Sequence, residues 1–157
     1  MKLPRGKKEF ALFMGVISII SVNIIAPLIT CFEMGFSINS WKCALGVLPF
    51  IWLSVIALVL ITYKPAEIIT GKIVAKEDSF NSHILTNVLC TVFMMSIFLT
   101  VIGSWIGSRN ISTEPLINFF YKWPRNFAIS FAVELLIAQP IARKVMVALH
   151  KHSDKDK

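Results

Sequence analysis

Residues 10–32 read FALFMGVISIISVNIIAPLITCF, an apolar stretch without a single charged side chain. About 20 mostly apolar residues in a helix cross the roughly 30 Å of hydrocarbon in a bilayer. A lone strand in lipid would leave its backbone amides unpaired, so the segment must be helical. It is longer than the apolar core of a signal peptide, and no Ala-x-Ala site follows it. The stretch therefore predicts a retained membrane-spanning helix.

Three further segments have the same character: residues 44–63, 84–106 and 123–142. The last is the weakest, because Arg125 lies near its start and Glu134 lies inside it. Apolar residues make up 55% of the chain and charged residues 16%, whereas soluble domains carry roughly 25% charged residues. This balance excludes a soluble enzyme, a disordered tail and a disulfide-rich secreted module. We expect an all-α fold, an integral membrane four-helix bundle.

The Lys and Arg residues, 16 in all, are distributed unevenly between the connections. Most lie before residue 10, between residues 64 and 82, or after residue 142. Because positively charged loops stay in the cytoplasm, we expect a multi-pass protein of the cell membrane with both termini cytoplasmic. The net charge of +7 then indicates contact with anionic lipid headgroups. No basic patch is interleaved with aromatic residues, so nucleic acid is not an expected partner.

The sequence overlays on itself when it is shifted so that Pro49 falls on Pro124 and Pro65 falls on Pro140. This match predicts an internal repeat of two tandem helical hairpins, with the domain boundaries 1–76, 77–151 and a polar cytoplasmic tail at 152–157. Both hairpins would begin and end in the cytoplasm, so the repeats are parallel and not inverted.

The second proline of each pair is expected to kink the chain where a span meets the cytoplasm. The segments that follow, residues 66–76 and 141–151, look amphipathic. Helices in the headgroup plane are one interpretation of them, and snorkelling helix ends are the simpler one.

Glu134 is the leading candidate for a functional side chain. A charged carboxyl in mid-span costs about 2.5–3.5 kcal/mol on insertion scales, so it should face protein or water. Asn126, Ser130 and Glu134 are spaced by four and share one helix face. One interpretation is a proton- or cation-responsive site, with Arg125 as the other charge near the rim. The other is a packing group satisfied by a nearby donor, for which Asn23 and Asn87 are the candidates.

The third predicted span carries two polar lines at four-residue spacing. One line contains Asn87 and Thr91, and the other contains Ser96, Thr100, Ser104 and Ser108. Polar faces on both sides predict a central helix that touches two neighbours. Lining of a pore is one interpretation of these lines, and packing between helices is the commoner one.

Residues 123–132 read WPRNFAISFA and residues 135–143 read LLIAQPIAR. This pattern resembles an uncharacterised bacterial membrane family, domain of unknown function 2798, whose module is a hairpin of two membrane helices. Its second helix often begins with Arg-Asn and ends near a Pro with a following Arg, which Arg125-Asn126, Pro140 and Arg143 match. The first repeat keeps its prolines but has apolar residues at the corresponding charged positions: Phe50, Ile51 and Ile68. The resemblance implies a bacterial membrane protein of two hairpins and no known activity.

No nucleophile set, phosphate-binding Gly loop or paired carboxylates are visible, so an enzyme is not expected, and neither is a cofactor. A bond between Cys31 and Cys43 stays open, and His150 with His152 is more typical of a solvated tail than of a metal site.

Two functions remain. A structural or accessory membrane protein, which binds a second copy or another membrane protein, is preferred because the spans contain few polar residues. The alternative is a small oligomeric transporter or channel, coupled to protons or cations through Glu134.

Overall fold

The computed structural model describes residues 7–75, 77–78 and 80–153. These residues form helices and connections and contain no strand. The elements are α1 (Lys7–Met34), α2 (Ile38–Ile73), α3 (Phe80–Ser108), α4 (Glu114–Ile117), α5 (Phe119–Val133), the π-helix η1 (Glu134–Ala138) and α6 (Gln139–Ser153). The expected all-α class is therefore confirmed. The end of the predicted tail, residues 154–157, lies outside the described residues.

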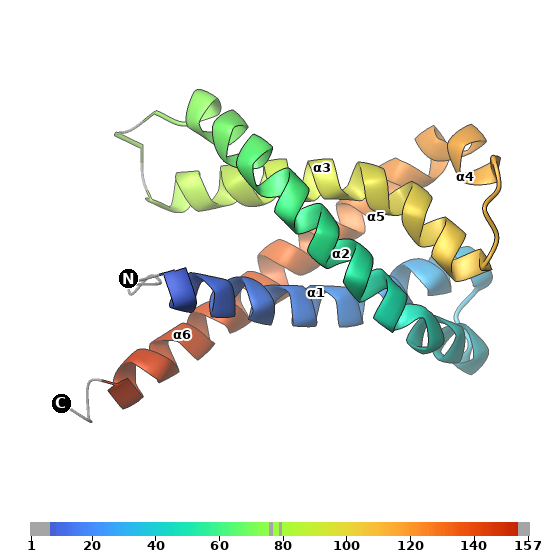
Figure 1. Cartoon of the computed structure of the whole chain (residues 1–157), viewed down its shortest axis with the longest axis horizontal. Coiled ribbons are helices and arrows are strands. Elements are labelled where there is room, and N and C mark those ends of the chain that lie inside the picture. The colour runs from blue at the N-terminus through green and yellow to red at the C-terminus, as the bar shows by residue number, and fades with distance from the viewer. Residues whose placement is uncertain (1–6, 76, 79, 154–157) are drawn as a thin grey trace.

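Three of the described helices are long and apolar enough to cross a membrane, over Gly15–Met34, Ile38–Ile73 and Ser82–Ser108. They contain the first three predicted spans. The fourth predicted span, residues 123–142, does not form one uninterrupted α-helix. It is divided among α5, η1 and the start of α6, which follow one another along a continuous ribbon (Figure 1).

The helices pack as a ring in which α1 contacts α2, α2 contacts α3, α3 contacts α5, and α5 contacts α1. Figure 1 shows α2 crossing α1 and α3 obliquely, while α5 and α6 follow the opposite diagonal. The start of α1, the end of α6 and the α2–α3 connection lie at one end of the molecule. The other two connections lie at the opposite end. As predicted, α3 has two principal neighbours, α2 and α5.

The turn between α1 and α2 is built from residues suited to a sharp reversal. Gly35 has a φ of 89°, a left-handed conformation that favours glycine. Ser37 then caps α2, because its Oγ accepts a hydrogen bond from the Ser40 amide at 3.2 Å. The Ser40 hydroxyl donates back to the Gly35 carbonyl at 2.7 Å. These bonds fix the end of the molecule where charged side chains gather.

Pro65 lies inside α2, which runs as one α-helix to Ile73. Residues 66–73 are thus the end of this helix and not a separate one, which agrees with the simpler interpretation. The kink at Pro65 stays a prediction. Beyond the proline the helix is held by packing: Ala66 is completely buried and Thr70 almost so. The Thr70 hydroxyl also bonds to the Ala66 carbonyl at 2.8 Å. The burial of these side chains compensates for the backbone hydrogen bond that proline cannot donate.

The second half deviates from an α-helix just before Pro140. In η1 the Gln139 amide donates to the Glu134 carbonyl, five residues earlier instead of four. One additional residue is thus accommodated in this turn. The parallel duplication stays a prediction, and so do its domain boundaries.

The π-turn makes deletion of Leu136 an informative test. Removing one residue from a π-turn restores α-helical spacing and leaves both flanking helices in register. Leu136 is also exposed, so little packing is lost. We expect the thermal unfolding midpoint in detergent to fall by only a few degrees. The control is deletion of Phe98, another exposed apolar residue but in regular α3. It rotates all later residues by about 100° and should prevent folding. Equal loss of folding in both deletions would contradict this prediction.

Candidate functional site

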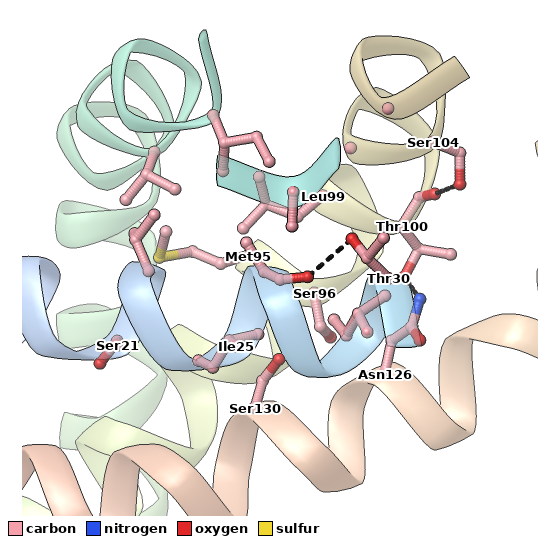
Figure 2. A pocket seen from close by; sticks show the side chains of 18 of the residues that line it. Ser21, Ile25, Thr30, Met95, Ser96, Leu99, Thr100, Ser104, Asn126 and Ser130 are labelled. Carbon is pink, nitrogen blue, oxygen red and sulfur yellow. Dashed lines mark hydrogen bonds between the residues drawn. The ribbon is translucent and has the colours of Figure 1, made fainter. Parts of the chain in front are cut away.

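The ring of helices surrounds a partly open cavity with a volume of about 590 Å³. Its walls come from α1, α2, α3, α5 and η1, together with the α3–α4 connection and Glu114 of α4. Figure 2 shows Asn126 and Ser130 extending from α5 toward the space beside α1, with Ser96 and Thr100 of α3 nearby. The rest of the wall combines aliphatic side chains with further hydroxyl, amide and charged groups, so about half of the lining residues are polar. The cavity therefore has aliphatic walls on which many polar groups converge.

The cavity extends along the helices. Its lining residues run from Ile17 to Met34 on α1 and from Asn87 to Ser108 on α3. At 1.5 Å per residue, these stretches are about 26 Å and about 32 Å long. The hydrocarbon core of a bilayer is about 30 Å thick. The cavity is thus comparable in length to the layer that a solute would have to cross.

Glu134 lines this cavity at the start of η1, where it is partly buried. Its Oε2 accepts a hydrogen bond from the hydroxyl of Ser21 on α1. The donors expected from the sequence are wrong. Asn23 bonds to the Ile19 carbonyl within its own helix at 2.7 Å, and Asn87 donates to the Thr70 hydroxyl at 3.4 Å. Ser21 was missed because its pairing with Glu134 joins opposite ends of the sequence.

Asn126, Ser130 and Glu134 all border the same cavity, so the shared face predicted from their spacing is confirmed. Asn126 is buried, and its Nδ2 donates to the Thr100 hydroxyl at 3.3 Å. Ala138, the next residue on this face, is completely buried against Ile17 of α1. The face therefore combines polar groups beside the cavity with close helix packing below it.

Both polar lines of the third span also reach the cavity. Its lining includes Asn87, Thr91, Ser96, Thr100, Ser104 and Ser108. Two of the hydroxyls are anchored to their own helix, since Ser104 donates to the Thr100 carbonyl at 2.8 Å and Ser96 to the Phe93 carbonyl at 2.9 Å. Ser96 in turn accepts from the indole of Trp123 at 2.9 Å. These polar groups therefore pack between the helices and also line the cavity.

Charged side chains gather where the cavity meets the α1–α2 and α3–α4 connections. Glu33 pairs with Arg125 at 3.4 Å and with Lys122 at 3.7 Å. Lys122 also contacts Glu114 at 2.9 Å. Arg125 therefore belongs to this outer group together with Glu33 and does not pair with Glu134. The sequence singled out Arg125 alone, because charged residues are common at the ends of membrane spans and do not indicate which of them form ion pairs.

Glu114 lies at the exposed edge of this group. Hydrogen bonds from Lys122 and then from Asn118 hold the pKa of the Glu114 carboxyl below its ordinary value. Glu114 therefore keeps its negative charge beside Lys122 under mildly acidic conditions.

The remaining candidate side chains are the three cysteines and the two histidines near the C-terminus. Cys31, Cys43 and Cys90 are free thiols. In the part of the chain that is described, no three His, Cys, Asp or Glu side chains are close enough to hold a metal ion. The side chains of His150 and His152 lie outside the described residues.

The described residues form an all-helical fold with three helices long and apolar enough to cross a membrane, which indicates a membrane-associated protein. Residues 79–150 match the model of a family described as "Domain of unknown function (DUF2798)". This match confirms the resemblance inferred from residues 123–143, and it covers α3, α4, α5, η1 and most of α6. Glu134 and Asn126 lie inside the matched region, whereas Ser21 lies outside it. No curated protein and no solved structure matched the chain.

Proposed function

We propose that this protein moves protons or small cations across the membrane through its central cavity. In this proposal α5, η1 and α6 supply the fourth crossing, and both termini face the cytoplasm. The supporting observation is the cavity itself, which is about as long as the bilayer core is thick and has Glu134 on its wall. Ionisable residues within membrane segments commonly mark ion pathways and proton relays.

The cavity is a reason to prefer transport over the accessory function. The accessory function was preferred because the spans contain few polar residues. Those few residues converge on one space, where they include Ser21, Asn126, Ser130 and Glu134.

The test is flux through proteoliposomes made with the purified full chain and loaded with a pH-sensitive dye. A potassium diffusion potential drives proton influx, and imposed sodium and ammonium gradients test coupling to cations. We expect a flux that rises with the amount of protein and exceeds that of protein-free vesicles. A signal equal to that of protein-free vesicles under every gradient would contradict the proposal.

An accessory function remains the second candidate because of one surface feature. Near the α3–α4 connection, four large apolar side chains are more than three-quarters exposed: Ile111, Ile117, Phe120 and Tyr121. Exposed apolar groups that cluster in this way often mark interaction sites. Cross-linking in native membranes followed by mass spectrometry tests this candidate, and a stable heterologous membrane partner would favour it.

A further inference from the structure

The charged side chains that line the cavity differ in whether an ion pair neutralises them. Its charged lining residues are Glu33, Glu114, Lys122 and Glu134. The first two carboxylates pair with Lys122, and Glu33 also pairs with Arg125. Among the described residues, Glu134 forms no ion pair, and its recorded partner is the neutral hydroxyl of Ser21. A partly buried carboxylate of this kind is costly unless a proton or a counter-ion neutralises it.

The walls near Glu134 indicate what kind of cation would suit the site. Small divalent metals require several oxygen ligands in a regular shell, whereas Glu134 is the one carboxylate in this part of the cavity. The aliphatic residues that line the cavity come from three helices and include Val22 and Ile25 of α1, Val55 and Val59 of α2, and Val92 and Leu99 of α3. Such walls favour a cation that carries an apolar body over a fully hydrated inorganic ion.

We propose that the cavity binds a small organic cation of the alkylammonium class. The cationic head lies against the Glu134 carboxylate, and the alkyl chain lies along the aliphatic walls of α2 and α3. The volume of about 590 Å³ is within the usual range for sites that enclose small organic molecules. This inference rests on the proposed function and names the substrate class of its cavity.

The test measures binding of tritiated hexyltrimethylammonium to the full chain in phosphatidylcholine nanodiscs, with empty nanodiscs as background. Saturable binding is expected, and hexanoate and heptanol should compete poorly because they lack the positive charge. Glu134→Gln should weaken binding by at least about tenfold, because the buried charge partner is lost. Glu67→Gln is the matched control. Glu67 is exposed on α2 and lies outside the cavity, so binding should change by less than about twofold.

A second variant tests the alkyl portion of the site. Gly103 lines the cavity, and a Cβ placed there would meet no atom within 4 Å. A Cβ at Gly103 therefore has open space, and Gly103→Leu extends its side chain into the cavity. It should weaken binding of the hexyl compound about tenfold or more and affect tetramethylammonium less. Gly46→Leu, at an exposed position of α2 outside the cavity, is the control.

Equal binding of heptanol and the cation, or full binding by folded Glu134→Gln, would overturn the inference. If Glu134→Gln fails to fold, unchanged binding by Gly103→Leu would overturn it as well. Proton flux without alkylammonium binding would defeat this inference and leave the proposed function standing. Saturable binding without any flux would support the site and defeat the proposed transport.

Discussion

Replacing Glu134 with glutamine is expected to reduce the protein-dependent flux through proteoliposomes to about one-tenth or less of the wild-type value. Glutamine has nearly the same size, and its amide oxygen can still accept the hydrogen bond from Ser21. It cannot carry a negative charge or an exchangeable acidic proton. The substitution therefore removes the chemistry while it keeps the packing, and the pH-sensitive dye inside the vesicles measures the result.

The same variant separates transport from packing. Because a carboxyl within a span is costly, Glu134→Gln should leave the thermal unfolding midpoint in detergent unchanged or raise it. Glu67→Gln, outside the cavity, should retain the full flux. Retained flux in Glu134→Gln would show that this carboxyl does not serve transport. A lowered midpoint with no flux in either protein would favour a packing role.

Enlarging Ala142 to leucine is expected to cause the largest loss of stability. Ala142 and Ala138 are completely buried against Ile17, where α6 and η1 meet α1. Such small residues permit close approach of helices, and additional methyl groups in a filled core typically cost about 1–3 kcal/mol. The unfolding midpoint in detergent should fall by about 2–4 °C for each kcal/mol.

Ala57→Leu provides the matched control for Ala142→Leu. Ala57 lies on an exposed part of α2, so the larger side chain meets no packed neighbour. Its midpoint should remain within about 2 °C of the wild type, since surface substitutions usually change stability by no more than about 0.5 kcal/mol. Equal midpoints for the two leucine variants would show that the α1–α6 contact is not tightly packed.

The positions of the helices were predictable because an apolar stretch must be long enough to cross a bilayer and must satisfy its own backbone. The sequence predicts a kink at Pro65, but it does not show that α2 continues as one helix to Ile73. That continuation depends on the burial of Ala66 and Thr70, which exists only in the folded chain. The π-turn was not predictable from the sequence either, because the residues of η1 have ordinary helix-forming side chains.

The candidate site was predictable along one helix and not between helices. Spacing alone placed Asn126, Ser130 and Glu134 on one face, because helical periodicity is a local property. The partner of Glu134 depends on which helix lies opposite, and the spacing of residues along one helix does not show this. Ser21 is separated from Glu134 by 113 positions. The cavity likewise arises from the order of the helices in the ring.

The length of α2 has a consequence for the behaviour of the protein in different membranes. With 36 residues it measures about 54 Å, but its uncharged stretch, residues 44–63, is only about 30 Å long and matches the hydrocarbon layer. A hydrophobic stretch that exceeds the local thickness is accommodated by tilting, by kinking or by local thickening of the bilayer. Because α2 supplies one wall of the cavity and crosses α3 obliquely, its inclination sets how widely those two walls diverge. A thinner bilayer, in which this stretch exceeds the hydrocarbon thickness, would favour a larger tilt of α2, so lipid composition would adjust the aperture of the chamber.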